Sequence, residues 1–434
     1  MNKTVLYVAV AVIITALICS ATVWYVMRPA PADVLEIYHW WTSGGEKDAI
    51  DALVDVFADD YPDTGVIQSP VAGGAGYVMK AVMKSLVLAG EAPDAFQMHA
   101  GYEGQPYFEG KYLEPISDLW QEEGWKPVIP DVVEDMVKFD GEYYAVPVNI
   151  HRVNVVWYNK HVLDDNGVDP ATLTTWDAFF DACDTLVTAG IAHPIALGDI
   201  GKWTDTHVLE QIIAGEGIDF YEDWVNGQVT SATDPKLVSA LNTFATYLGY
   251  VNVDHVTLTW DEAIARVITG DAAFSVMGDW ANGEFYKAGK VYDTDYGTIP
   301  TPGTGVMYGL CIDCFQHPKG VKHPENSLRW LKVVGSKEGQ DAFNPIKGSI
   351  SARTDSDTTK YGPYQAAAIA DFTAATYMYP SVAHGSGAPA AFTAELDDIM
   401  SAFVTDKDVS AAATALTAAT TAASADYTTD WSLD

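Results

Sequence analysis

The sequence predicts an α/β protein with two lobes, and three observations support this prediction. Runs rich in β-forming residues, such as 34–38 and 272–277, alternate with helical patterns such as 46–61, an order typical of α/β sheets with largely parallel strands. The segment after the N-terminus is about 400 residues long, which is too long for one ordinary hydrophobic core. No further apolar run of about 18 residues follows Arg28, so this segment is expected to be soluble and extracytoplasmic.

The N-terminus carries an apolar segment that predicts a membrane helix. Residues 4–27 are uncharged and lie between Lys3 and Arg28. A helix of about 23 residues, at about 1.5 Å per residue, spans the roughly 30 Å hydrocarbon core of a bilayer. We therefore expect residues 1–33 to form an uncleaved N-terminal anchor and a short linker. A cleaved signal peptide is the alternative, although its apolar core is ordinarily only about 7–15 residues long.

Local patterns place the elements in the first half of the chain. In the segment 46–61, apolar residues such as Ile50 and Leu53 recur at the spacing of one helix face. The glycines at 73–76 predict a tight turn, although a glycine-rich turn before a helix can also bind an anion. In chain order, we expect a strand at 34–38, a helix at 46–61, a turn at 73–76, a helix at 77–89, a strand at 95–98 and an extended segment at 146–158.

Capping residues mark the helices of the second half. The side chains of Thr175 and Asp234 can accept hydrogen bonds from the free N–H groups at a helix start. The expected elements are helices at 175–187, 234–248 and 259–268, a strand at 272–277 and an alanine-rich helical tail at 388–425. The threonine-rich residues after about 425 are expected to form a linker without regular structure.

The chain is strongly acidic and rich in aromatic residues. Its 59 acidic and 24 basic residues give a formal net charge of −35, which argues against nucleic-acid binding because a phosphate backbone would be repelled. Solubility is the simplest reason for this charge. Aromatic residues form 12% of the chain and include 13 tryptophans and 23 tyrosines, so flat amphipathic surface is available to a core or to a ligand.

Two of the four cysteines, Cys311 and Cys314, form a CxxC pair. No second CxxC exists that could complete a zinc site, and neither a metal nor another cofactor is expected. The surrounding segment 307–315 is predicted to be one strand, in which residues three apart point to opposite faces. Two unpaired structural thiols are therefore expected. A strained local disulfide and a redox pair are the alternatives.

Motifs of common enzyme classes are absent from the sequence. It contains no HExxH zinc motif, no GxSxG nucleophile turn, no Walker loop and no complete GxGxxG dinucleotide motif. Acidic residues are numerous enough to form pairs by chance, and none stands out as the carboxylate pair of a glycosidase. The protein is therefore not expected to be an enzyme.

Several short loops combine an aromatic side chain with a polar or charged one. They lie at 40–46, 96–101, 148–152, 277–280, 344–350 and 384–389. Several follow a predicted strand, at the edge where open α/β sheets bind ligands. An indole ring can stack on the apolar C–H face of a sugar, and carboxylates, amides, Lys and His bond to sugar hydroxyls. Together these loops predict a sugar-binding cleft.

Six segments carry a resemblance to a known family. The most specific are PVNIHR at 147–152, MGDWA at 277–281 and NPIKGSI at 344–350, and the others include EIYHWW, PDAFQMHAG and AHGSGAP. They occur in order between residues 36 and 389, so they cover nearly the whole segment after the N-terminus. In these motifs the chain resembles the extracellular solute-binding proteins of ABC sugar importers, and within them the glucose-, galactose- and mannose-binding branch.

The resemblance implies a type II periplasmic-binding-protein fold, with two α/β lobes, three hinge crossings and the ligand in the cleft between the lobes. The segment 148–152 resembles the first crossing, and 277–280 is expected near the second. The first lobe is then expected to comprise 34–148 and 280–325, and the second lobe 149–279 and 326–434.

The resemblance also implies a set of ligand-binding residues. Trp40 and Trp41 correspond to tryptophans at the mouth of the first strand, one of which stacks on the sugar. Asp279 is the carboxylate expected to accept hydrogen bonds from sugar hydroxyls. Trp224 resembles a second-lobe tryptophan that would face Trp41 across the sugar. The remaining expected ligand residues are Glu46, Gln97, His99, Asn149, Trp280, Lys347 and His384.

The implied function is that of an extracytoplasmic receptor that captures glucose, galactose or mannose and delivers it to an ABC importer after hinge closure. The expected partners are the sugar, the permease subunits and, through the N-terminal helix, the membrane. A monomer on the outer face of the cytoplasmic membrane is expected, or a secreted protein if the segment is cleaved. The main alternative is the same role for an oligosaccharide or another polyol. A sensory subunit and an extracellular glycoside hydrolase are further alternatives.

Overall fold

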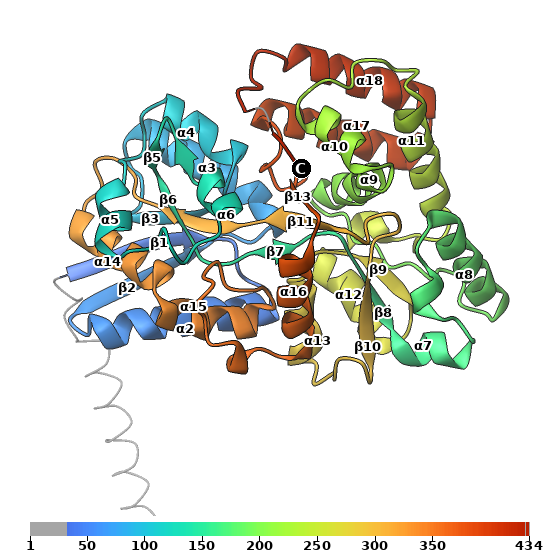
Figure 1. Cartoon of the computed structure of the whole chain (residues 1–434), viewed down its shortest axis with the longest axis horizontal. Helices are drawn as coiled ribbons and strands as arrows, with labels where there is room; N and C mark the ends of the chain where they lie inside the picture. The colour runs from blue at the N-terminus through green and yellow to red at the C-terminus, as the bar shows by residue number, and fades with distance from the viewer. Residues whose placement is uncertain (1–32, 430, 434) are drawn as a thin grey trace, which may run out of the picture.

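Two lobes of mixed α/β structure make up the described chain (Figure 1). The structure is a computed structural model, and it describes residues 33–429 and 431–433. The predicted N-terminal anchor, whose apolar segment is 4–27, lies outside the described residues. Within the described ranges, no helix has both the length and the apolar character needed to cross a membrane.

A five-stranded sheet organises the first lobe, with the strand order β2-β1-β3-β12-β6. Strand β1 runs parallel to β2 and β3, whereas β12 is antiparallel to β3 and β6. The strands are β1 (Asp33–His39), β2 (Thr64–Pro70), β3 (Ala95–His99), β6 (Ala145–Pro147) and β12 (Asp313–Gln316), and β4 (Lys138–Phe139) and β5 (Glu142–Tyr143) form a separate pair. The predicted strands at 34–38 and 95–98 are therefore confirmed.

Helices cover this sheet, and their apolar faces form the first-lobe core. In α2 the residues Ile50, Leu53 and Phe57 are fully buried, which confirms the helix face predicted from their spacing. Helix α15 packs along α2, and α14 packs on β1 and β6. The helices are α2 (Gly44–Asp60), α3 (Tyr77–Ala89), α4 (Gln105–Glu109), α5 (Ser117–Glu122), α6 (Asp131–Met136), α14 (Pro324–Gly335) and α15 (Lys337–Lys347).

The second lobe contains two three-stranded sheets, with the orders β10-β8-β9 and β13-β11-β7. Both pairings in the first of these sheets are antiparallel, so the prediction of largely parallel strands is wrong for this lobe. The strands are β7 (His151–Arg152), β8 (Val155–Asn159), β9 (Phe274–Val276), β10 (Tyr296–Pro300), β11 (Met307–Cys311) and β13 (Tyr377–Pro380). An alternation of helices and strands does not by itself specify strand direction. A long connection between two strands allows the second strand to run parallel or antiparallel to the first.

The helices of the second lobe begin where their capping residues predict. The Thr175 hydroxyl accepts from Ala178 N at 3.3 Å, and the Asp234 carboxylate accepts from Lys236 N at 2.9 Å. The helices are α7 (Lys160–Asp165), α8 (Trp176–Thr188), α9 (Trp203–Gly215), α10 (Ile218–Val225), α11 (Pro235–Tyr247), α12 (Trp260–Thr269), α16 (Pro363–Ala374), α17 (Ala390–Asp406) and α18 (Val409–Ala422), and α13 (Ala281–Lys287) touches both α2 and α12.

Three segments of the described chain pass between the first-lobe sheet and the second-lobe sheets. The first, 148–150, joins β6 to β7, as the sequence predicts. The second is Ile312, between β11 and β12, and not the neighbourhood of 277–280. The third follows α15, and its Ile350 forms a backbone bridge with Ile150 of the first crossing, with N–O distances of 2.8 and 3.1 Å. The crossings therefore support one another through backbone hydrogen bonds.

The predicted lobe boundaries need correction after residue 280. Residues 280–325 were expected in the first lobe, but β10 pairs with β8, and β11 pairs with β7 and β13. Residues from 326 onward were expected in the second lobe, but α14 and α15 pack on first-lobe elements. Local periodicity identifies a strand or a helix, and it carries no information on which distant sheet that element joins.

The C-terminal end of the chain lies against both lobes. The alanine-rich tail forms α17 and α18 as predicted, separated by Lys407 with φ of 54°. The prediction of a linker after about 425 is wrong in one respect. This segment has no regular structure, but the second-lobe Asn226 side chain bonds both N and O of Trp431 at 2.8 and 2.9 Å. The first-lobe Tyr102 hydroxyl accepts from Thr429 N at 2.7 Å.

Candidate functional site

A chamber between the two lobes brings together most of the predicted ligand residues. Its walls come from the loop after β1, the end of β3, the starts of α9 and α12, and the crossings near β7 and β12. The lining side chains are Trp40, Trp41, Glu46, Ala75, His99, His151, Trp203, Trp260, Trp280, Cys311, Asp313, Lys347 and His384. The tertiary fold thus gathers residues that are hundreds of positions apart in the sequence.

Five of these residues are tryptophans, and they form the aromatic part of the wall. Trp40 and Trp41 come from the first lobe, directly after β1. The ring of Trp40 lies 4.8 Å from the ring of His99. The rings of Trp203 and Trp280 lie 6.1 Å apart. All of these indoles are nearly buried, so the chamber offers several flat apolar surfaces away from bulk water.

The glycine-rich turn at 73–76 makes room for these rings. It forms a short 3-10 turn, η1 (Gly74–Gly76), before α3, so the predicted tight turn is confirmed. Gly76 has φ of +71°, and a Cβ there would lie 2.5 Å from the ring of Trp40. A Cβ on Gly74 would lie 2.9 Å from both Trp203 and Trp260. These glycines allow close packing of the backbone on the chamber tryptophans.

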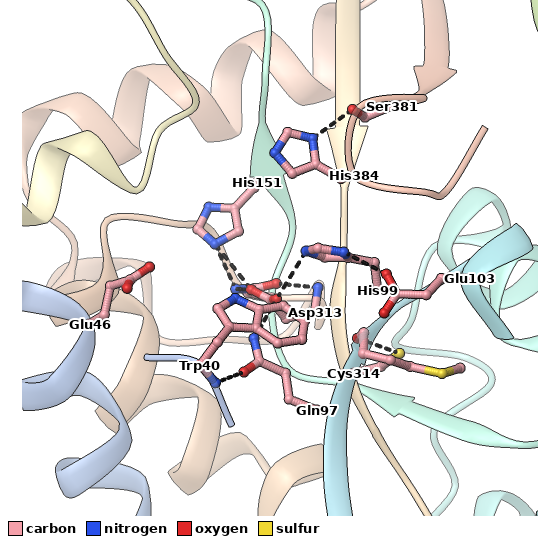
Figure 2. A network of polar contacts seen from close by, with 12 residues as sticks. Trp40, Glu46, Gln97, His99, Glu103, His151, Asp313, Cys314, Ser381 and His384 are labelled. Atoms are coloured by element: carbon pink, nitrogen blue, oxygen red, sulfur yellow. Dashed lines mark hydrogen bonds and ion pairs between the residues drawn. The ribbon is translucent and has the colours of Figure 1, made fainter. Parts of the chain in front are cut away.

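Asp313 is the buried acceptor at the centre of the polar network (Figure 2). Gln97 Nε2 and Asn149 Nδ2 each donate to its carboxylate at 2.8 Å. His151 Nε2 lies 3.3 Å from the same carboxylate, and His99 Nε2 lies 3.7 Å from it. Burial by itself would raise the pKa of Asp313, but the hydrogen bond and charge of His151 outweigh burial and hold this pKa well below its usual range.

His151 lies between two carboxylates, with Asp313 on one side and Asp279 on the other. Its Nδ1 bonds Asp279, whose other oxygen accepts from Arg152 N at 3.0 Å. Burial and the Lys347 ammonium act to lower the pKa of His151, but the two carboxylates outweigh them and raise it. Asp279 is fully buried behind His151 and does not line the chamber. His151 and Asp313 therefore occupy the part of the chamber wall where Asp279 was expected.

Glu46 and Lys347 form an ion pair at the chamber wall. The Lys347 ammonium lies 3.1 Å from Glu46 Oε1 and 6.0 Å from the ring of Trp280. Ser43 Oγ donates to the other Glu46 oxygen at 3.1 Å. Because both charged groups retain free hydrogen-bonding positions, they can still contact a ligand.

His384 presents an unpartnered nitrogen in the chamber wall. Its Nδ1 lies 2.7 Å from Ser381 Oγ, and that hydroxyl donates to Glu210 at 2.9 Å. Its Nε2 is buried and has no hydrogen-bond partner in the described part of the chain. Burial, together with the neighbouring His99, lowers the pKa of His384 well below its usual value. This imidazole is therefore neutral, with one nitrogen available to a ligand.

Trp224 lies away from the chamber. It belongs to α10, where its ring packs against Tyr221 at 5.6 Å and Phe392 at 6.4 Å. The prediction that it faces Trp41 across a ligand is therefore wrong. The apolar face of α10 is buried in the second-lobe core, and a tryptophan on such a face packs inward whatever its resemblance to a ligand residue.

The other predicted residues divide between the lining and the support behind it. Trp40, Trp41, Glu46, His99, Trp280, Lys347 and His384 line the chamber, whereas Gln97, Asn149 and Asp279 lie behind the wall. The lining residues not predicted are Ala75, His151, Trp203, Trp260, Cys311 and Asp313. His151 lies in the PVNIHR motif, so it could have been predicted as a lining residue. Trp203 and Asp313 could not have been predicted, because nothing in the local sequence distinguishes them from core or surface residues.

Cys311 and Cys314 are free thiols in two different strands. The predicted single strand at 307–315 is wrong, because the chain passes from the second-lobe sheet to the first-lobe sheet at Ile312. Cys311 lines the chamber, whereas the Cys314 thiol donates to Met98 O at 3.2 Å. The expectation of two unpaired thiols is confirmed.

The chamber is nearly filled by its own side chains. The free volume inside the chamber is only about 20 Å³, which is room for one or two water molecules. A larger ligand therefore requires the walls to move apart.

The polar side chains and aromatic rings of the lining are suited to ligand binding. In residues 33–429 and 431–433, no group of three or more His, Cys, Asp and Glu is arranged to hold a metal ion. The chamber carboxylates are Glu46, which is paired with Lys347, and Asp313, whose pKa is lowered. A carboxyl group that acts as a general acid at neutral pH needs a raised pKa. The lining instead offers hydrogen bonds and flat rings.

Comparisons with known proteins agree with this geometry. A family model described as bacterial extracellular solute-binding protein matches residues 41–341. The chain is 47% identical to an uncharacterized ABC transporter extracellular-binding protein of Pyrococcus horikoshii over 382 residues, which cover 88% of this chain and 86% of the relative. It is 33% identical over 376 residues to a probable sugar-binding periplasmic protein of Rhizobium meliloti, covering 85% of this chain and 89% of the relative.

A similar fold is found among solved structures. The bacterial solute receptor AcbH, described with an exclusive substrate preference for β-D-galactopyranose, superposes with a TM-score of 0.79. The superposition covers 91% of this chain and 99% of that receptor, at 18% sequence identity. The two-lobe architecture is therefore shared, although few residues are.

Proposed function

Because the chain belongs to the bacterial extracellular solute-binding proteins, we propose that it is a receptor that captures a hexose, namely glucose, galactose or mannose, and delivers it to an ABC importer. The observation that carries this proposal is the chamber between the lobes, where five tryptophans and a set of buried polar groups face one another. The relatives named as sugar-binding proteins support the same class of ligand.

The aromatic walls support a sugar ring as the ligand. A pyranose has two faces of C–H groups, and an indole ring provides a flat, polarisable surface against which such a face can stack. Trp40 and Trp41 lie in the first lobe. On the second-lobe side, Trp203 and Trp260 begin helices α9 and α12, and Trp280 follows strand β9. A ring held between the lobes would therefore meet indoles on both sides.

The polar groups support a ligand with several hydroxyls. The unpartnered His384 Nε2 is a buried nitrogen, and leaving such a group unpaired costs about 1–3 kcal/mol. The Glu46 carboxylate and the Lys347 ammonium provide charge-assisted bonds, which are stronger than neutral ones. A hydroxylated ring would satisfy these groups together, whereas an apolar ligand of the same size would leave them unsatisfied.

The closed state of the chamber supports capture by movement of the lobes. A hexose does not fit into space for one or two waters, so ligand entry requires an opening motion. The three crossing segments are the places where such a hinge would bend.

We also propose that residues 4–27 hold the receptor at the outer face of the cytoplasmic membrane. A tethered receptor stays near its permease, which raises the effective concentration of one for the other. Carbonate extraction of cell membranes tests this, and the full-length protein is expected in the membrane pellet. A shortened form free in the culture medium would contradict the anchor and favour a cleaved signal peptide.

A thermal-shift panel on the full-length protein tests the ligand class. Glucose, galactose, mannose, maltose and trehalose are each added in excess, because a ligand that binds only the folded state raises the melting temperature by mass action. At a hundred times the dissociation constant the expected stabilisation is about 2.7 kcal/mol. A shift with a hexose supports the proposal. Shifts confined to disaccharides would replace the hexose by an oligosaccharide, and no shift with any sugar would contradict sugar binding.

A matched pair of tryptophan variants tests the site itself. Trp203→Ala removes an indole from the chamber wall and is expected to weaken sugar binding roughly tenfold. Trp176→Ala removes a half-buried indole at the start of α8, outside the chamber, and is expected to leave affinity unchanged. Isothermal titration of both variants provides the comparison, and equal affinities would remove Trp203 from the proposed site.

A further inference from the structure

A second cavity lies outside the chamber and is lined in part by α13, β10 and α16. Figure 1 shows where these three elements lie in the fold. The cavity shares no lining residue with the chamber. Its volume is about 400 Å³, which falls in the range of about 300–1,000 Å³ found for small-molecule sites. Its walls come from α13 and the loop after it, from β10, from the end of α15 and from the start of α16. The cavity is therefore large enough for a single ring.

Tyrosines dominate the walls of this cavity. Tyr286, Tyr292, Tyr296, Tyr361 and Tyr364 all contribute to the lining. The ring of Tyr292 lies 5.5 Å from that of Tyr296 and 5.7 Å from that of Tyr364. Tyr286, at 70% exposure, is far more open than the other four. Such a set of aromatic faces is suited to a flat or ring-shaped ligand.

The charge of the cavity is opposite to that of the molecule. Its lining includes Lys290 and Lys360 and contains no Asp or Glu, although the chain has 59 acidic residues against 24 basic ones. In the described residues, neither ammonium lies within 4.0 Å of a carboxylate. The nearby Asp295 is engaged by Val291 N at 2.8 Å and by His161 at 3.1 Å. Neither ammonium therefore contacts a carboxylate directly, although Lys290 lies near Asp295 and the exposed Lys360 lies near Asp357.

An amide donor adds to this preference for an acceptor ligand. Asn282 Oδ1 accepts from the Tyr296 hydroxyl at 2.8 Å, which orients the amide. Its Nδ2 makes no hydrogen bond to the described residues, and Asn282 lines the cavity. The polar groups of this lining without a partner among the described residues include two ammonium groups and an amide N–H, which are donors, and the Tyr361 and Tyr364 hydroxyls, which can donate and accept.

We propose that this tyrosine-lined cavity binds a small ring-shaped carboxylate, with the ring against the tyrosines and the carboxylate paired with Lys290 and Lys360. A neutral sugar would leave both ammonium groups unpaired, and a cation would be repelled by them. An aromatic acid and a sugar acid share the required chemistry, since both combine a ring with a carboxylate. This site is independent of the hexose proposed for the chamber.

Titration of the full-length protein with two acids and their neutral counterparts tests the proposal. The acids are 4-hydroxybenzoate and glucuronate, and the neutral compounds are 4-hydroxybenzyl alcohol and glucose. The titrations are repeated with saturating hexose, because binding at the separate cavity is not displaced by a ligand of the chamber. At least one acid is expected to bind in both conditions, with its neutral counterpart at least tenfold weaker in the presence of hexose. Failure of both acids to bind, equal binding of the neutral compounds, or displacement by hexose would overturn the proposal.

Two lysine variants locate the binding. The double variant Lys290→Gln and Lys360→Gln removes both unpaired charges and is expected to weaken acid binding at least tenfold. Lys287→Gln is the matched control, because Lys287 ends helix α13 three residues before Lys290 but bonds Asp48 and Gly44 O, each at 3.0 Å, outside the cavity. Both variants are checked for an unchanged melting temperature. Undiminished acid binding by the folded double variant would overturn the assignment to this cavity.

Discussion

Among single residues, Asp313 is the central hydrogen-bond acceptor on the polar side of the chamber. Its carboxylate accepts from Gln97 and Asn149, both at 2.8 Å, and its backbone N–H donates to Asn149 Oδ1 at 2.9 Å. These bonds fix the position of the carboxylate, and the hydrogen bond and charge of His151 keep it ionised. Any ligand in the chamber therefore meets a rigid acceptor whose position is set by residues from three different segments.

The variant Asp313→Asn tests the importance of this acceptor. Replacing one oxygen by an NH₂ group places a donor against the donors Gln97 and Asn149, and it removes the charge. Sugar affinity is expected to fall at least tenfold, about 1.4 kcal/mol, as measured by isothermal titration at a temperature where the variant is folded. Asp164→Asn, at an exposed position on α7, is the control. An Asp313→Asn variant that binds as tightly as the wild type would contradict this role.

His151 makes the stability of the protein depend on pH. Its pKa is raised in the folded state, above a value of about 6.5 in the unfolded chain. The stabilisation linked to its proton is therefore fully present below about pH 6.5 and is lost as pH rises through the raised pKa. Melting temperatures between pH 6 and 9 are expected to fall more steeply for the wild type than for His151→Gln. His161→Gln, at an exposed site, should retain the wild-type slope, and parallel curves for all three proteins would contradict the assignment.

At the scale of elements, side-chain caps set where the helices of the second lobe begin. Thr259 N donates to Glu262 at 2.9 Å at the start of α12, and Asp234 accepts from Lys236 N and Leu237 N at the start of α11. The start of α12 also places Trp260 in the chamber wall. A local sequence signal thus positions a chamber residue, because the cap fixes the first turn of the helix.

Removal of the α11 cap tests this contribution to stability. Asp234→Ala leaves two N–H groups of the first turn without their acceptor and is expected to lower the free energy of unfolding by about 0.5–2 kcal/mol. Urea denaturation followed by circular dichroism measures the loss. Asp181→Ala, at an exposed position within α8, is the control and should cause no such loss. An Asp234→Ala variant with unchanged stability would show that the cap is unimportant.

At the scale of the whole molecule, contacts between distant segments hold the two lobes together. The backbone bridge between Ile150 and Ile350 links two of the crossings. The C-terminal segment bonds Tyr102 of the first lobe and Asn226 of the second. Any motion that opens the chamber must bend the crossings, and these contacts limit the directions in which the lobes can move.

The large negative charge of the molecule predicts a stability that increases with salt. A formal net charge of −35 destabilises the compact state through self-repulsion. Salt shortens the range of this repulsion, from about 30 Å at 0.01 M to about 8 Å at 0.15 M. The melting temperature is therefore expected to rise over this range. Sodium and tetramethylammonium chloride should act equally if screening is the cause, and a flat or falling melting temperature would contradict the prediction.

Spacing and residue type were enough to predict most of the elements and much of the chamber. Helix faces, caps and glycine turns are local, so α2, α8, α11 and the turn at 73–76 could be predicted from spacing and residue type. The family resemblance predicted seven of the residues that line the chamber, including Trp40 and His384, because those residues lie in continuous motifs. The parallel strands β1 and β3 end at the same edge of the first-lobe sheet, and this is why Trp40 and His99 meet.

The grouping of elements into lobes and the direction of the chamber side chains could be read only from the folded chain. The assignment of β10, β11, α14 and α15 depends on pairings between distant segments, which leave no local signal. Asp279 and Trp224 show the same limit for single residues. One is covered by His151, and the other is buried in the core of its own lobe. A side chain's direction is set by what packs around it, and that packing exists only in the folded chain.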